Sequence, residues 1–290
     1  MSDTALQRAR RLLEILDLEQ VEENLYLGQN EVESPMRLFG GQVLAQATAA
    51  AYRTVDNVQL HSMHGYFIRA GSSERPVLYE IERIRDGRSF TTRRVVAIQN
   101  GLAIFNLDVS FQIEELGFEH AHPMPNVPLP SELEDDILVA SKISSNNPRR
   151  RALRKVERPF ETRSVFPLDS AEWGEDRSHS PLWIRFREPV DPLNQLLARS
   201  LLAYASDMSV VSTACLPHQE QVEFNALQMA SLDHALWIHR PVPIDEWLLF
   251  HKRTSTAQGS RGLVHADFYT ESGALLASMT QEGLLRLRQD

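Results

Sequence analysis

Hydrophobic and polar positions follow a helical period twice along the chain. One apolar stripe runs through Val43, Leu44, Ala47, Ala50 and Ala51, at the spacing of a single buried helix face. A second stripe runs through Leu193, Leu196, Leu197, Leu201, Tyr204 and Ala205. The pattern predicts helices at residues 39–55 and 191–208, each with one side facing a core.

Each predicted helix is followed by a strand-rich region. A strand at residues 61–69 opens the first region, which continues to residue 113, and a strand at residues 227–239 opens the second, which continues to residue 286. Asn100-Gly101 is a strong signal for a two-residue hairpin, and Ser272-Gly273 occupies the corresponding place in the second region. Two copies of one unit, a helix with an antiparallel sheet, explain this order.

The segment between the copies has a different composition. Residues 117–159 contain Pro123, Pro125, Pro128 and Pro130 and an acidic run at 132–136, a pattern that sustains neither a long helix nor a sheet. We interpret it as a linker with one short helix near residues 136–144. The predicted domains are therefore 1–116, 117–159 and 160–290. Small residues in the first helix allow close contact with a sheet, so the predicted class is α+β, with two tandem hotdog units in which a sheet wraps a central helix.

Charge and cysteine content narrow the function. The formal net charge is -9, which disfavours binding to nucleic acid, and we interpret the basic cluster at residues 149–155 as a solvated face. Cys215 is the only cysteine, so no internal disulfide can form, and we predict a cytoplasmic protein. No apolar stretch is long enough to span a bilayer.

Asp207 stands out by its position. In a regular helix it lies about 40° around the axis from Leu193, beside the apolar stripe and at the helix C-terminus. Burial and the negative end of the helix dipole both disfavour a carboxylate there. The pattern leaves two interpretations open: a functional carboxylate, or a residue that turns to solvent and caps the next loop.

Several segments in fixed order resemble the bacterial acyl-CoA thioesterase II family. They are residues 39–42, 61–67 and 85–87 in the first half, and 202–207, 231–241 and 280–283 in the second. The resemblance implies a double hotdog fold, self-association into a homo-oligomer, and a catalytic Asp, Thr and Gln. Asp207 and Gln281 match this trio, whereas the Thr position is Ser231, which keeps the hydroxyl and loses a methyl group.

The implied trio suits thioester hydrolysis. Asp207 is expected to take a proton from water, and Ser231 and Gln281 to orient that water. Backbone N–H groups at Gly41 and Gln42 are candidates for an oxyanion site, although the glycines of this turn also suit close packing alone. His61 either lines the substrate channel or is structural. Strand alternation predicts that His234 points away from Ser231 and forms no relay with it.

Three functions follow from these features. The first is hydrolysis of fatty acyl-CoA to a free fatty acid and CoA. The second is acyl-CoA binding without catalysis, and the third is enoyl-CoA hydration on the same kind of fold. No nucleotide-binding glycine pattern is present in the sequence, so no cofactor is expected. His120 and His122, near Glu119, could suggest a metal site, but in a Pro-rich linker we interpret them as a solvated loop and expect no metal.

Overall fold

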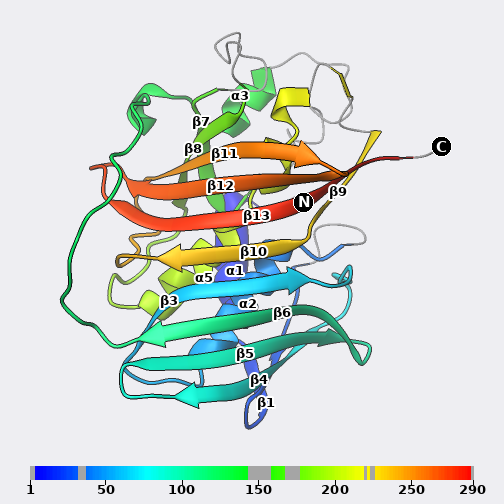
Figure 1. Ribbon diagram of the computed structural model, residues 1–290, viewed down its shortest axis with the longest axis vertical. Coiled ribbons are helices and arrows are strands. Elements are labelled where there is room, and N and C mark those ends of the chain that lie inside the picture. Colours follow the sequence, from blue (N-terminus) through cyan, green and yellow to red (C-terminus); the bar gives the residue numbers. More distant parts are fainter. Residues whose placement is uncertain are drawn as a thin grey trace.

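The computed structural model describes residues 4–31, 37–142, 158–166, 177–218, 221–222 and 226–288, so the basic cluster at 149–155 lies outside the described residues. Within these ranges the strands form one 13-stranded sheet in which every pairing is antiparallel. Figure 1 shows the sheet curving in front of two central helices, α2 (Gly40–Tyr52) and α5 (Gln195–Ser206).

The two halves contain corresponding elements. Helix α1 (Ala5–Leu16) begins the first half, whose strands are β1 (Glu19–Glu22), β2 (Leu25–Gly28), β3 (Gln59–Phe67), β4 (Val77–Asp86), β5 (Phe90–Gln99) and β6 (Leu102–Gln112). The strands of the second half are β7 (Phe160–Ser164), β8 (His179–Phe186), β9 (Leu227–Ser231), β10 (Asp233–Ile238), β11 (Leu248–Gln258), β12 (Arg261–Thr270) and β13 (Leu275–Leu287). The second half also contains helix α6 (Val210–Thr213) and the 3-10 turn η3 (Leu216–His218).

The strand order confirms the duplication and the double hotdog fold. It runs β1-β2-β4-β5-β6-β3-β10-β13-β12-β11-β8-β7, so each half repeats the other outward from the centre. The halves join where β3 pairs with β10, with Ala235 opposite His64. Between β6 and β7 lie the 3-10 turn η1 (Pro130–Glu132) and helix α3 (Asp136–Lys142), close to the predicted short helix. The exact domain boundaries at 116/117 and 159/160 stay a prediction.

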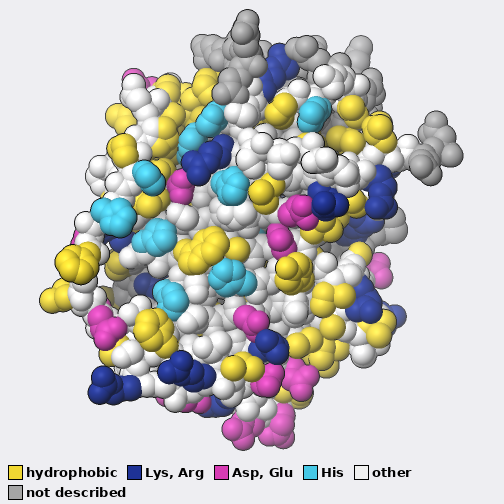
Figure 2. Space-filling view, in the orientation of Figure 1, with side chains coloured by type: hydrophobic (Ala, Val, Ile, Leu, Met, Phe, Trp, Pro, Cys, Tyr) yellow, Lys and Arg dark blue, Asp and Glu magenta, His cyan; other side chains and the backbone are white. Residues whose placement is uncertain are grey.

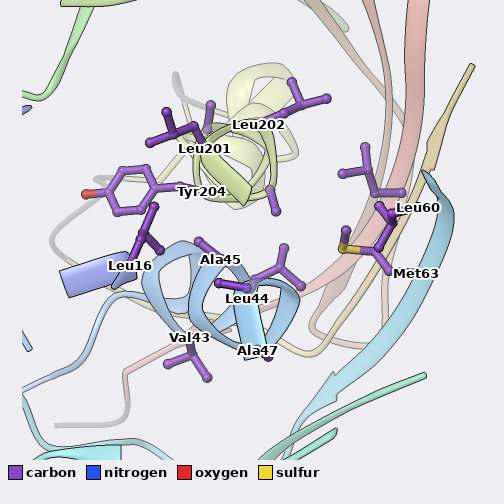
Figure 3. Packing of buried hydrophobic residues seen from close by; sticks show 14 of the residues in the cluster. Leu16, Val43, Leu44, Ala45, Ala47, Leu60, Met63, Leu201, Leu202 and Tyr204 are labelled. Atoms are coloured by element: carbon purple, nitrogen blue, oxygen red, sulfur yellow. The ribbon is translucent and has the colours of Figure 1, made fainter. Parts of the chain in front are cut away.

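The core lies where the two helices meet each other and the sheet. All five apolar residues predicted for the first helix face are buried in α2. Figure 3 shows α2 and α5 packed together, with Leu60 and Met63 of β3 facing them. The prediction for the second helix is wrong at its start, because Leu193 is 90% exposed and α5 begins at Gln195. The Asn194 side chain caps the helix by accepting a bond from the Leu197 N–H, so Leu193 remains outside it.

The strand predicted at 227–239 is interrupted at Leu232. Ser231 of β9 lies opposite Gly283 of β13, whereas Ala235 of β10 lies opposite Thr280. With an unbroken register, Ala235 would lie opposite the residue before Thr280. The register against β13 therefore shifts by one residue between β9 and β10. Such a shift turns the following side chains to the other face of the sheet.

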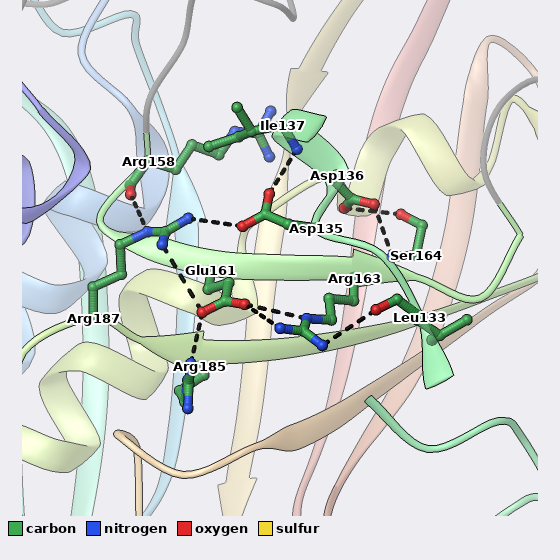
Figure 4. Close-up of polar contacts among 10 residues, drawn as sticks. All are labelled: Leu133, Asp135, Asp136, Ile137, Arg158, Glu161, Arg163, Ser164, Arg185 and Arg187. Carbon is green, nitrogen blue, oxygen red and sulfur yellow. Dashed lines mark hydrogen bonds and ion pairs between the residues drawn. The ribbon is translucent and has the colours of Figure 1, made fainter. Parts of the chain in front are cut away.

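The linker is held to the second half by charged side chains. Figure 4 shows Glu161 of β7 accepting hydrogen bonds from Arg163 and Arg185, at 2.8 and 2.7 Å, while Arg163 donates to the linker carbonyl of Leu133 at 3.2 Å. In the same view Asp136 of α3 accepts from the N–H and hydroxyl of Ser164. These bonds fix the crossing segment against β7 and β8. In the described part of the chain, no helix is long and apolar enough to cross a membrane.

Candidate active site

Asp207 lies at the meeting point of the two halves. It directly follows α5, and its side chain is buried, with the residue 7% exposed. Burial of a carboxylate is unfavourable unless hydrogen bonds satisfy it. The structure supplies these bonds from three separate segments of the chain.

Ser231 and Gln281 both contact one oxygen of Asp207. The Ser231 hydroxyl at the end of β9 donates to Asp207 Oδ1 at 3.0 Å, and Gln281 Nε2 on β13 donates to the same oxygen at 3.0 Å. Gln281 Nε2 also donates to Ser231 Oγ at 2.9 Å. The structure therefore brings together all three residues of the predicted trio.

The third segment is the first turn of α2, which belongs to the other half. The Gly41 N–H donates to the Asp207 carboxylate, and the α-carbon of Gly40 lies so close that an added methyl group would be 2.7 Å from Oδ2. The positive end of the α2 dipole thus offsets the negative end of α5. The sequence argument considered α5 alone and missed this contact, which joins residues far apart in the chain.

Burial raises the pKa of Asp207 to about 6, although hydrogen bonds from Gln281, Ser231 and the Gly41 N–H lower it in part. A carboxyl group with this pKa is ionised at neutral pH and still basic enough to take a proton from water. Among the described residues, no group of three side chains is arranged to hold a metal ion.

Comparison with known proteins identifies the family. A family model described as acyl-CoA thioesterase matches residues 150–284, and one described as the acyl-CoA thioesterase N-terminal domain matches residues 32–112. Acyl-coenzyme A thioesterase 8 of Mus musculus is 38% identical over 94% of this chain and 88% of its own length. The chain belongs to the acyl-CoA thioesterase family.

Bacterial relatives agree with this assignment. Acyl-CoA thioesterase 2 of Haemophilus influenzae is 32% identical over 96% of this chain and 98% of its own length. The crystal structure of the acyl-CoA thioesterase II TesB2 from Mycobacterium marinum has 37% identity and a TM-score of 0.79, covering 96% of this chain and 98% of that one. The protein is therefore a thioester hydrolase.

His234 belongs to the hydrogen-bond network around Asp207, and sequence reasoning missed it. It is buried, and its Nδ1 lies 2.5 Å from Gln281 Oε1 while its Nε2 lies 2.9 Å from Ser206 Oγ. The prediction that His234 points away from Ser231 is wrong in its orientation, because the register shift at Leu232 turns the ring inward, whereas none of the described hydrogen bonds joins His234 directly to Ser231. A polar side chain on the buried face of a strand would have indicated a functional residue. Sequence reasoning could place His234 on that face only if the register shift were known.

The His234 ring fixes the orientation of Gln281. Burial lowers the pKa of His234 to about 4, although the hydrogen bond that the ring makes to Gln281 Oε1 raises it in part, so the ring is neutral at pH 7. Gln281 directs its NH₂ group to Asp207 and Ser231, so its Oε1 is an acceptor and His234 Nδ1 carries the proton. His234 thereby holds the Gln281 amide with both N–H groups toward the trio.

The other predicted residues of the thioesterase lie apart from this network. The Gln42 side chain donates to Asn30 Oδ1 at 2.9 Å, and the Gln42 backbone N–H bonds to the carbonyl of Phe39. His61 Nε2 lies 2.8 Å from Ser110 Oγ, and the ring packs edge-on against Phe90. Within the described residues neither side chain contacts the trio, so their roles in substrate binding stay predictions.

The first half of the thioesterase has a different arrangement at the end of its helix. After α2, Thr54 is covered by the buried Arg93, whose guanidinium donates to the Thr54 hydroxyl at 2.9 Å and to the Thr54 carbonyl at 3.1 Å. Arg93 also pairs with Asp86. A buried cation and its partners lie near the end of α2, whereas the carboxylate of Asp207 lies at the end of α5.

Proposed function

We propose that the protein hydrolyses fatty acyl-CoA to a free fatty acid and CoA through a water activated by Asp207 and oriented by Ser231 and Gln281. The observation that carries this proposal is the shared Oδ1 of the buried Asp207, which accepts bonds from Ser231 Oγ and Gln281 Nε2, each at 3.0 Å. The family resemblance supports the same three positions. The second half would then hold one water-activating site per chain.

The second carboxylate oxygen of Asp207, Oδ2, is the atom that we expect to accept the proton. Ser231 and Gln281 both bond to Oδ1, so Oδ2 keeps a lone pair for a proton from the attacking water even where it also accepts the Gly41 N–H. The water oxygen forms a bond to the thioester carbonyl carbon, and the tetrahedral intermediate then releases the CoA thiolate. A thiol has a pKa of about 8.5, so its thiolate leaves without a strong general acid. Proton removal and positioning of the water are thus the main demands on the protein.

The first turn of α2 is our candidate for polarising the carbonyl. The Gly41 N–H already bonds to Asp207, which makes Gly41 a positioning element rather than an available oxyanion donor. Gly40 is the first helical residue, so its N–H is one of the amides that a helix leaves without an internal partner. We assign the Gly40 N–H and the positive end of the dipole to the developing oxyanion.

Asp207→Asn tests the proposal. The variant should bind acyl-CoA as the wild type does, and its release of free thiol should fall by at least about 10²-fold, the lower end of a general base's contribution. Ser231→Thr should keep most activity, and Ser231→Ala should slow turnover without unfolding the protein. Turnover by Asp207→Asn at the wild-type rate would refute the assignment. Equimolar free thiol and fatty acid distinguish hydrolysis from binding alone and from enoyl-CoA hydration.

We also propose that the protein self-associates into a homo-oligomer and that it acts in lipid metabolism in the cytoplasm. Tyr66 and Trp237 lie 64% and 36% exposed on the two central strands of the sheet. Figure 2 shows hydrophobic and histidine side chains mixed over this face. An exposed apolar sheet face supports a homo-oligomer. Light scattering on the eluting protein tests this, and a monomer at micromolar concentration would count against it.

A further inference from the structure

A pocket lined by three arginines lies beside β9, toward the end of the strand away from Ser231. Its volume is about 620 Å³, within the range of small-molecule sites, and it is lined by Arg37, Gln228, Arg286, Leu287 and Arg288. Among the described ion pairs, none involves these three arginines. Figure 2 shows Lys and Arg side chains gathered along this edge, near the C-terminal end of the chain. Such a concentration of positive charge on an acidic protein favours an anionic ligand.

Three chain segments connect this pocket to the proposed catalytic site. Arg37 is three residues before Gly40, Gln228 is three residues before Ser231, and Arg286 is five residues after Gln281. The last two segments belong to the paired strands β9 and β13, with Gln228 directly opposite Arg286. At about 3.3 Å per residue, Arg286 lies roughly 17 Å along the strand from Gln281.

This distance matches the arm of coenzyme A. Thirteen bonds join the sulfur of pantetheine to its first phosphorus, a length of about 15 Å when it is extended like a peptide. In the described residues β9 has a ladder partner, β13, on one edge only. The other edge leaves backbone N–H and C=O groups for the two amides of pantetheine. A thioester held at Asp207 thus places the phosphates within reach of the arginines.

We propose that Arg37, Arg286 and Arg288 bind the phosphate groups of the CoA nucleotide while the pantetheine arm follows the open edge of β9 to Asp207. This inference rests on the proposed function, because it takes the thioester to react at Asp207. Guanidinium groups form paired hydrogen bonds with phosphate oxygens and retain their charge at every relevant pH. Gln228 adds an uncharged donor and acceptor at the same place.

The test compares two thioesters with the double variant Arg286→Gln/Arg288→Gln. Acyl-CoA carries the nucleotide phosphates, whereas the matching acyl-pantetheine carries none. The KM for acyl-CoA should rise by about tenfold or more, as expected for the loss of charged hydrogen bonds, with kcat nearly unchanged. Turnover of acyl-pantetheine should not change. The control Arg83→Gln/Arg85→Gln removes the same charge from exposed positions on β4 and should leave both substrates unaffected.

An unchanged KM for acyl-CoA, or a parallel loss with acyl-pantetheine, would overturn the inference. Calorimetric titration with CoA separates this outcome from failure of the proposed function, because binding of CoA needs no turnover. The double variant should bind CoA about tenfold more weakly than the wild type and the control. If the wild type hydrolyses no acyl-CoA, the proposed function fails, and the CoA titration still decides whether the pocket binds the nucleotide. Equal CoA affinity in all three proteins would refute the pocket.

Discussion

Gly40 lies directly against the carboxylate of Asp207, although the two residues belong to different halves of the chain. A methyl group at Gly40 would lie 2.7 Å from Asp207 Oδ2 and 2.9 Å from the Phe67 ring, closer than side-chain carbons pack. Asp207 cannot yield freely, because Ser231 and Gln281 hold its other oxygen. The presence of glycine at this position is therefore a requirement of the site.

Gly40→Ala should displace the base and lower kcat by about 10²-fold, since misplacement of a catalytic group by about 1 Å has this effect. Alanine is the better helix former by up to about 1 kcal/mol, but the crowded methyl group costs about 1–3 kcal/mol, so the midpoint of thermal unfolding should fall by a few degrees while the protein still folds. Gly117→Ala is the matched control, because nothing lies within 4 Å of the added methyl group there. Wild-type kcat in Gly40→Ala would show that the carboxylate position is not critical.

The pH dependence of the rate should report the titration of Asp207. Its pKa is raised to about 6 by burial, so kcat/KM should rise with pH up to a plateau above that value. In Ser231→Ala the loss of a hydrogen bond to the charged form should move this limb to higher pH. The pKa of a carboxyl group changes little with temperature, whereas that of an imidazole changes strongly. A strongly temperature-dependent limb would assign it to a histidine and contradict the prediction.

Asp207 should also reduce the stability of the folded protein at neutral pH. A folded-state pKa of about 6 against the ordinary 3.8 means that the folded state binds the proton more tightly than the unfolded state. Wild-type stability should therefore fall as pH rises through this window, by up to about 3 kcal/mol. Asp207→Asn lacks this loss and should be more stable than the wild type at pH 8, with the difference vanishing below pH 4. Chemical denaturation at both pH values measures it. A difference independent of pH would refute the explanation.

Local patterns predicted much of the fold and part of the site. Period and turn signals located the repeated helices and strands, including the hairpin at Asn100-Gly101, where both residues adopt positive φ angles of 52° and 73°. The resemblance supplied Ser231 and Gln281, which the structure brings to Asp207. Features that depend on contacts between distant segments were not predictable in this way. The α2 turn reaches Asp207 only because the two helices pack together.

The orientation of the His234 side chain was likewise not predictable from local sequence patterns. Whether a side chain faces the core depends on strand register, and a shift of one residue at Leu232 reverses the expectation. Local periodicity carries no signal for such a shift. The start of α5 differs for a related reason, since a single capping bond from the Leu197 N–H to Asn194 excludes Leu193 from the helix.

His234→Leu should lower kcat by about tenfold or more, because Gln281 would lose the partner that fixes its amide orientation. A freely rotating amide also donates less to Asp207, so the acidic limb of the rate profile should move above its wild-type position. His234→Asn retains a donor near the Nδ1 position and should recover most of the lost rate. A purely structural role would change stability without moving the limb, and that outcome would contradict the prediction.

Glu161→Gln should destabilise the attachment of the linker to the second half, because Glu161 orients Arg163, which donates to the linker carbonyls of Pro130 and Leu133. Burial alone would raise the pKa of Glu161, but hydrogen bonds from Arg185 and Arg163 outweigh it, so the pKa is lowered. The neutral amide would direct an N–H group at one of these guanidinium groups. We expect a loss of about 1–2 kcal/mol at pH 7, less than for a fully buried pair because Arg185 is 40% exposed.

The sign of the pH dependence distinguishes this ion pair from packing. With a lowered pKa, Glu161 stabilises the protein above its unfolded-state pKa near 4.5, and this contribution disappears as pH falls through the folded-state value. The difference between wild type and Glu161→Gln should therefore shrink in acid. Glu82→Gln is the control, since Glu82 makes a long exposed contact of 3.9 Å with Arg94 and should contribute little. Thermal unfolding of all three proteins at neutral and acidic pH measures the effect, and a constant difference would assign Glu161 to packing rather than charge.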